Sequence, residues 1–204
     1  MLFTRSQTKK QKSYLGGFSL VELLITIGIV TLVTGAVLTK HSGFTNSTLL
    51  KAQAIELSLD IRAAQQYGVS VRSDNANSRY AYGIYFSPSA RGEYVLYSDA
   101  NDNLLYDAGE EVGRRYTFDP RFEIREVCTP DALNTRVCSA DRAGSVAFKR
   151  PNFDAVIGNT DAAGAAASYG IHGRGWIEFV IGPVDGSTAE RSVIVYQTGQ
   201  IAVY

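Results

Sequence analysis

An apolar segment close to the N-terminus constrains this chain more than any other feature. Residues 18–39 contain one charged side chain, Glu22. A helix rises about 1.5 Å per residue, so these 22 residues extend about 33 Å and suffice to cross a hydrocarbon core about 30 Å thick. The sequence therefore predicts one membrane-spanning helix over residues 18–40.

The charges on either side of this segment predict its orientation. Four basic residues and no acidic residue lie in residues 1–17, whereas only Lys40 and His41 directly follow the apolar segment. The excess of positive charge favours a cytoplasmic N-terminus and export of residues 41–204. Beyond residue 17 the chain has 16 basic residues against 20 acidic residues, so a general attraction to nucleic acid or anionic lipid is not expected.

Two common classes of N-terminal segment explain this pattern incompletely. A secretory signal peptide has an apolar region of about 7–15 residues that ends in a small-residue cleavage site, and this segment is longer. A plain signal anchor fits the length better but gives Glu22 no role. An intramembrane carboxylate costs about 2.5–3.5 kcal/mol at the bilayer centre, so it usually has a partner.

The sequence Gly-Phe-Ser-Leu-Val-Glu-Leu-Leu-Ile, from Gly17 to Ile25, resembles the prepilin motif. Type IV pilins, the pseudopilins of type II secretion and competence pilins share this motif. In these families a membrane aspartyl peptidase cuts after the glycine and methylates the new N-terminus. The resemblance implies that Gly17 precedes the cut, Phe18 becomes the methylated first residue and Glu22 is the acid at the fifth mature position.

The same resemblance implies partners and a location. In a filament, Glu22 of one subunit pairs with the Phe18 amine of its neighbour and so sets the axial register. The expected partners are other pilin or pseudopilin subunits, the prepilin peptidase and an inner-membrane assembly platform. Residues 1–17 are then a leader peptide, and the mature chain is a single-pass membrane protein with an extracytoplasmic body.

Beyond the membrane segment, the pattern predicts a second helical stretch. Residues 42–48 are rich in helix-breaking and capping types, so a bend or an interruption is expected there. Apolar or small residues then recur in steps of four and three, which predicts a helix over residues 48–72. They are Leu50, Ala54, Leu57, Ile61, Ala64, Gly68 and Val71. The favoured interpretation is packing on the sheet of the same body, with a partner-binding coiled coil as the alternative.

Short aromatic and β-branched runs follow and predict strands. They span residues 80–86, 94–97, 116–118, 122–127, 145–148, 175–181, 192–196 and 200–204. Gly199, preceded by Thr198, supplies the turn of a terminal hairpin. The predicted fold class is α+β, with a long N-terminal helix packed on antiparallel sheet. Its layout resembles that of pilins, and most closely H-type minor pseudopilins and FimT-like minor pilins.

Cys128 and Cys138 are the two cysteines of the chain. If the body is exported, they are expected to form a disulfide, which contributes about 2–3 kcal/mol for so short a loop. Two reduced, unrelated thiols are the alternative.

An acidic segment after residue 98 carries oxygen-bearing side chains at the spacing of an EF-hand loop. Its candidate calcium ligands are Asp99, Asn101, Asn103, Asp107 and Glu110, with the backbone carbonyl of Leu105. Leu104, however, occupies the sixth position, where the sharp turn requires glycine. In the alternative, the Asp and Asn side chains cap turns of their own loop. H-type minor pseudopilins often carry a similar acidic turn. No cofactor is expected unless this loop binds calcium.

Catalysis has little support, because the chain has two histidines and neither a Gly-x-Ser-x-Gly nor a His-Glu-x-x-His motif. The predicted function is therefore structural: a minor pilin or pseudopilin of a type IV pilus or of a type II secretion pseudopilus. The alternative is a minor pilin that binds DNA or another surface in competence or adhesion. Its candidate DNA-binding residues are Arg114, Arg115, Arg121 and Arg125, although a solvated strand face is the favoured interpretation.

Overall fold

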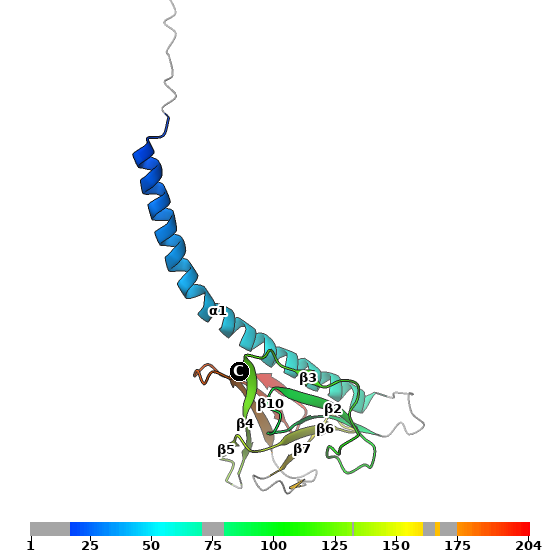
Figure 1. The fold of residues 1–204 in the computed structure, drawn as a ribbon. Helices are drawn as coiled ribbons and strands as arrows, with labels where there is room; N and C mark the ends of the chain where they lie inside the picture. Colours follow the sequence, from blue (N-terminus) through cyan, green and yellow to red (C-terminus); the bar gives the residue numbers. More distant parts are fainter. Residues whose placement is uncertain (1–16, 71–79, 132, 161–165, 168–174) are drawn as a thin grey trace, which may run out of the picture. The chain divides into compact units, whose positions relative to one another are not determined.

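The computed structural model describes residues 17–70, 80–131, 133–160, 166–167 and 175–204 (Figure 1). It divides into two compact units, Met1–Phe44 and Thr45–Tyr204. One helix, α1 (Leu20–Val69), runs through both units. The helix is continuous through residues 42–48, so the interruption that was one of the two possibilities there is wrong, whereas the bend stays a prediction. Serine, threonine and one glycine cost a helix about 1 kcal/mol or less each, and tertiary context overrides propensities of this size.

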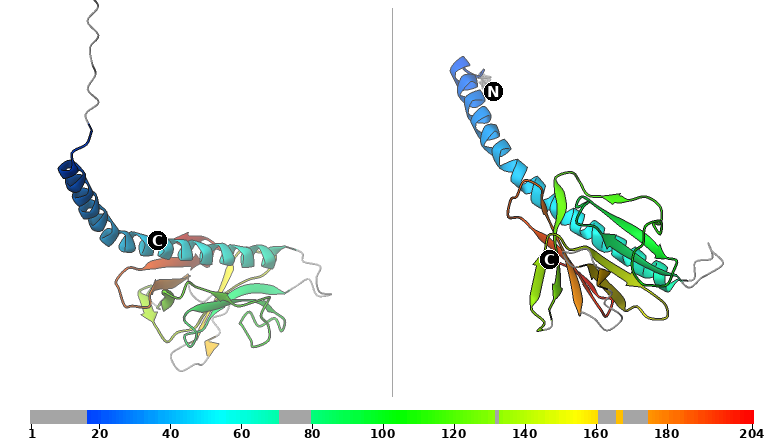
Figure 2. Two further views of the ribbon diagram at one scale, coloured as in Figure 1. Left: turned by 45° about the horizontal axis from the view of Figure 1, so that its top comes forward. Right: turned by 60° about the horizontal axis from the view of Figure 1, so that its bottom comes forward.

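Two antiparallel sheets and the second half of α1 build the larger unit (Figures 1 and 2). The first sheet has the strand order β3-β2-β1-β6-β7-β8, and the second has the order β11-β10-β9-β4-β5. The strands are β1 (Ala81–Phe86), β2 (Glu93–Asp99), β3 (Tyr116–Thr117), β4 (Phe122–Pro130), β5 (Arg136–Ser139), β6 (Gly144–Phe148), β7 (Ala155–Thr160), β8 (Ala166–Ala167), β9 (Trp176–Pro183), β10 (Arg191–Tyr196) and β11 (Ile201–Val203). The α+β class is confirmed.

One stripe of α1 forms the centre of the core of the larger unit. Its buried members are Leu50, Ala54, Leu57, Ile61 and Ala64. They belong to one apolar cluster with side chains of both sheets, among them Phe148 of β6 and Phe179 of β9. The predicted packing of this stripe on its own body is confirmed for the described residues, because a stripe that is already buried in this way cannot also form a coiled coil. Val71, the last predicted member, lies outside the described residues.

The C-terminal end of α1 approaches the sheets closely. A Cβ atom added to Gly68 would lie 2.2 Å from the carbonyl oxygen of Phe148, so only glycine fits there. One turn earlier, the Gln65 amide donates hydrogen bonds to the carbonyl oxygens of Phe153 (3.3 Å) and Gly199 (3.1 Å). Gly199 has φ of +81°, as predicted for the turn between β10 and β11. These contacts fasten the helix end to the terminal hairpin.

All eight predicted strand runs correspond to strands of the structure, whereas β5, β7 and β8 were missed. The sequence of β5, Arg-Val-Cys-Ser, is short and polar, and its pairing comes from β4 beside it. β7, with the sequence Ala-Val-Ile-Gly-Asn-Thr, contains the types that ordinarily favour turns. In both strands, pairing with a neighbour overrides the weak local preference.

We expect Gly68→Ala to destabilise the body by about 1–3 kcal/mol, since the new methyl group meets backbone rather than a movable side chain. The better helix propensity of alanine, about 1 kcal/mol, offsets part of this loss. Chemical unfolding of the purified protein measures the change. Gly92→Ala is the matched control, because its Cβ meets nothing within 4 Å. Equal midpoints for the two variants would contradict the close approach.

Candidate functional site

The start of α1 places the residues of the prepilin-like motif in two different backbone settings. Gly17 and Phe18 precede the helix, and the amide of Val21 donates a hydrogen bond to the Ser19 hydroxyl (3.3 Å). Ser19 therefore acts as the N-cap residue. A Cβ added to Gly17 would meet nothing within 4 Å, so the bond after Gly17 lies in open backbone outside the helix.

Glu22 lies in the first turn of α1. Its negative charge is favourable there, because the helix N-terminus carries partial positive charge. With Ser19 it also has the Ser-x-x-Glu spacing of a capping box, in which the acid at the third helical position accepts a hydrogen bond from the N-cap amide. This local role for Glu22 was not predicted, although the Ser-x-x-Glu spacing is its signal in the sequence. Capping requires a side-chain oxygen, which glutamine also has, whereas an ion pair requires the charge.

The segment after Glu22 presents apolar side chains on all sides. Leu20–Leu38 has a mean hydropathy of 2.3 and none of it is buried, which makes it apolar and long enough to span a membrane. Two of its hydroxyl groups are satisfied within the helix, since Thr26 donates to the carbonyl of Leu23 and Thr31 to that of Ile27, both at 2.9 Å. Polar groups satisfied in this way are tolerated in a hydrocarbon environment.

The predicted calcium-binding segment, residues 99–111, forms the acidic loop. This loop begins at the end of β2, leads toward β3 and folds on itself. The buried carboxylate of Asp99 accepts hydrogen bonds from the backbone amides of Asn103 (3.1 Å) and Leu104 (2.8 Å). The side-chain amides of Asn101 and Asn103 both donate to Asp107 Oδ2 at 2.7 Å. The structure thus has the capping arrangement that was the alternative to a calcium site.

Glu110 completes the loop and Leu104 departs from the expected backbone. Glu110 accepts hydrogen bonds from the amides of Ala100 (2.8 Å) and Asp107 (3.0 Å). Leu104 has φ of +64°, the left-handed conformation that glycine adopts at the sixth position of an EF-hand loop. The loop therefore makes this turn with leucine at the position where an EF-hand loop has glycine. Calcium binding stays a prediction.

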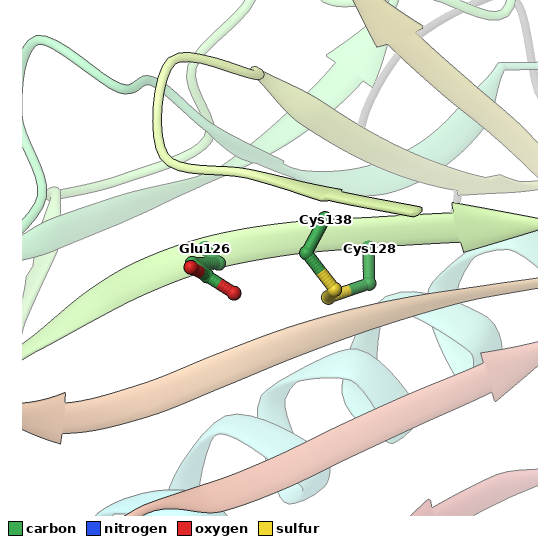
Figure 3. A group of neighbouring side chains, drawn as sticks. All are labelled: Glu126, Cys128 and Cys138. Carbon is green, nitrogen blue, oxygen red and sulfur yellow. A yellow bond between two sulfur atoms is a disulfide. The ribbon is translucent and has the colours of Figure 1, made fainter. Parts of the chain in front are cut away.

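Within the part of the chain that the structure describes, one group of three acidic or cysteine side chains is close enough to share a metal ion. It consists of Glu126, Cys128 and Cys138 (Figure 3). Cys128 and Cys138 form a disulfide across β4 and β5, which confirms the predicted pairing. Because a metal-binding cysteine must be a thiolate, this group is not a metal site in the oxidised protein.

The acidic loop also covers the outer face of the first sheet, which the sequence did not indicate. Tyr106 stacks on Tyr85, with ring centres 4.4 Å apart, and meets the edge of Tyr97 at 5.7 Å. Gly83 makes room for this arrangement, since its added Cβ would lie 2.7 Å from the Tyr97 ring. The signal for this packing in the sequence was Gly83 itself, because a glycine within a strand often marks a place where another group approaches the backbone closely.

Burial and hydrogen bonding raise the pKa values of two tyrosines, Tyr97 beneath this loop and Tyr106 within it. The fully buried Tyr97 has its pKa raised by desolvation. The hydroxyl of Tyr106 donates a hydrogen bond to Glu111, which raises the pKa of Tyr106 to about 12 and lowers that of Glu111. Both tyrosines are therefore neutral at physiological pH, and Tyr106 acts as the hydrogen-bond donor to Glu111.

The arginines proposed for DNA binding are largely neutralised by carboxylates. Arg115 pairs with Glu93 (2.6 Å) and Arg125 with Glu190 (3.1 Å). Arg121 binds Asp119 at 2.8 Å, and this hydrogen bond lowers the pKa of the Asp119 carboxyl to about 2. DNA binding needs positive charge that phosphates can neutralise, and these pairs reduce it at three of the four candidate arginines. The DNA-binding alternative stays a prediction with less support than before.

Comparisons of the chain with models of known families, with curated proteins and with solved structures find no match. The geometry of the described residues therefore carries the functional argument.

We expect Gly83→Ala to destabilise the body by about 1–3 kcal/mol, because the methyl group would press on both the Tyr97 ring and the backbone of Val146. Chemical unfolding measures the loss, and Gly175→Ala, with open space around its Cβ, is the control. Unchanged stability of Gly83→Ala would show that Tyr97 does not lie over β1 as described.

If the acidic loop binds calcium, the purified protein should release or absorb heat on titration and unfold at a higher temperature in millimolar calcium. Asp107→Ala should abolish both effects, since Asp107 is a candidate ligand whose removal leaves the rest of the loop sequence intact. Asp141→Ala, an exposed acid outside the loop, is the control. The absence of heat and of a thermal shift in the unmodified protein would exclude the site.

Proposed function

We propose that this chain is a structural subunit of the type IV pilin class, a minor pilin or pseudopilin that is cut after Gly17 and joins a filament through α1. The observation that carries the proposal is the arrangement at the start of α1. Gly17 lies in open backbone before the helix, Glu22 lies in its first turn, and an apolar segment without further charge follows.

The apolar half of α1 needs a partner outside the chain. Its large side chains are exposed, for example Leu20 at 75% and Leu32 at 74%. Burying such a side chain is worth about 1.5–3 kcal/mol, so the segment cannot remain in water. A bilayer satisfies this requirement before assembly, and neighbouring copies of the same helix satisfy it in a filament.

The charge of Glu22 needs a partner of its own. A capping role would satisfy one carboxylate oxygen but would leave the negative charge in apolar surroundings, where it is costly. Cleavage after Gly17 creates an amine on Phe18, and methylation keeps that amine cationic. Pairing of this amine with Glu22 of the next subunit neutralises both charges and sets how far one helix is displaced along the other.

The remaining features fit this role. The one helix apolar enough to span a membrane among the described residues supports a single-pass membrane protein with residues 1–17 on the cytoplasmic side. The disulfide between Cys128 and Cys138 is typical of an oxidising, extracytoplasmic compartment. Under this proposal the partners are other pilin or pseudopilin subunits, the prepilin peptidase and the inner-membrane assembly platform.

The intact mass of the membrane-extracted protein tests the processing step. In cells with the prepilin peptidase, we expect loss of residues 1–17 and addition of one methyl group. Deleting the peptidase or introducing Gly17→Ala should abolish both changes. Because the Cβ added to Gly17 meets nothing in the chain, an effect of this substitution reports on the peptidase and not on folding.

Gly28→Ala provides the matched control, since Gly28 is a helix glycine whose Cβ also meets nothing within 4 Å, and it should be processed normally. An uncut protein, or a cut elsewhere in the wild-type chain, would refute the proposal. The chain would then be a membrane-anchored or secreted α+β domain.

Replacing Glu22 separates its two candidate roles. Glu22→Gln keeps the capping oxygen and removes the charge. If the charge pairs with the Phe18 amine, Glu22→Gln should be cut and methylated normally but should be lost from isolated filaments, as Glu22→Ala should be. If capping alone matters, Glu22→Gln should assemble like the wild type and only Glu22→Ala should fail. Quantitative blotting of sheared filaments distinguishes the outcomes, with Glu123→Gln in the body as control.

A further inference from the structure

A small pocket lies at one end of the first sheet, on the face that the acidic loop covers. Its walls come from the end of β1, the start of β2 and the loop, with Tyr85 and Val95 opposite each other across the two strands. The pocket has a volume of about 240 Å³. Sites for drug-sized ligands span about 300–1,000 Å³, so this pocket suits a ligand no larger than one ring.

One wall of the pocket is aromatic. Tyr85 comes from β1 and Tyr106 from the acidic loop, and their rings stack with an interplanar angle of 20°. The Tyr106 hydroxyl is held by Glu111, so the loop presents this ring in a fixed position. Stacked tyrosines offer apolar ring surface next to polar groups, which suits a ligand that is apolar on one face and polar at its edge.

The rim of the pocket supplies hydrogen-bond donors and acceptors without net charge. Arg115 donates a hydrogen bond to Glu93 at 2.6 Å, and this bond uses one of the five N–H groups of the guanidinium. The hydroxyls of Ser87 and Ser89 lie 2.8 Å apart and can each donate or accept. An ionic ligand would have to compete with the pair of Arg115 and Glu93, whereas a neutral polyhydroxyl ligand can bind both members.

The position of the pocket disfavours an extended peptide. β1 and β2 are interior strands of the sheet, since β6 pairs with β1 and β3 pairs with β2. Neither strand has an open edge along which a peptide can add in β conformation. A compact ligand that enters end-on fits this geometry better.

We propose that this pocket binds a single neutral saccharide ring, with C–H groups of the sugar against the side of the tyrosine pair that Tyr85 and Tyr106 form, and with its hydroxyls hydrogen-bonded to Arg115, Glu93 and the two serines. The site lies wholly within the larger unit and requires neither cleavage at Gly17 nor assembly. Failure of the sugar site and failure of the proposed structural role are therefore distinguishable.

Saturation-transfer NMR on the full chain tests the site. The protein is held in micelles of lauryldimethylamine oxide, because detergents with sugar head groups would compete. The probes are the methyl glycosides of glucose, galactose, mannose and N-acetylglucosamine. At the binding free energy per atom that is usual for small ligands, a ligand of one ring should bind with a millimolar Kd. We expect saturable transfer from the protein to at least one probe.

Two substitutions and one matched control locate the binding. Arg115→Ala should weaken binding about tenfold, as expected for loss of a hydrogen bond to a charged group. Ser89→Trp, at an exposed position on the rim, should abolish binding by filling the pocket. Arg114→Ala removes the neighbouring exposed arginine, which does not line the pocket, and should bind like the wild type. Thermal unfolding verifies that the variants are folded.

Three results would overturn the proposal. The first is the absence of saturable transfer to every glycoside. The second is equal affinity of Arg115→Ala and Arg114→Ala together with undiminished binding by Ser89→Trp. The third is saturable binding of N-acetyl amino-acid amides with none of the glycosides, which would assign the pocket to a peptide ligand instead.

Discussion

Burial of one stripe of α1 is the interaction on which the body depends. Leu50, Leu57 and Ile61 are at most 1% exposed, and they share one apolar cluster with side chains of both sheets. Fully burying each such side chain contributes about 1.5–3 kcal/mol. Tyr94 adds a polar link, since its hydroxyl donates a hydrogen bond to Asp60 on α1. Because α1 also carries the apolar segment that precedes the body, one helix has a stripe buried in the body and an apolar half that the chain leaves exposed.

Close backbone approach gives this packing its specificity. At Gly68 the helix comes so near to β6 that a methyl group would overlap the carbonyl of Phe148, and at Gly83 the ring of Tyr97 lies directly on β1. Tyr106 of the acidic loop then packs against Tyr97. The loop thus belongs to the packed structure of the first sheet. The pocket beside Tyr85 and Tyr106 follows from the same packing.

The two candidate functional regions, the prepilin-like motif and the acidic loop, could be predicted from the sequence to different degrees. The pattern of Gly17, Phe18 and Glu22 is local, so spacing alone identified it, and the structure added the N-cap role of Ser19. The sequence of the acidic loop shows oxygen-bearing side chains at the spacing of calcium ligands. Whether these oxygen atoms converge on a cation or accept hydrogen bonds from backbone amides depends on the path of the backbone. Leu104 adopted the left-handed turn that its side chain disfavours, which no spacing rule predicts.

The sequence by itself determined the apolar helix, its single carboxylate, the buried stripe, most strands and the α+β class, because periodicity and residue type act over short stretches of chain. Only the tertiary structure decided the rest. It determined that β5 and β7 form and that three of the candidate arginines are paired with carboxylates. These features depend on residues distant in sequence. Their contact energies exceed local preferences of about 1 kcal/mol or less.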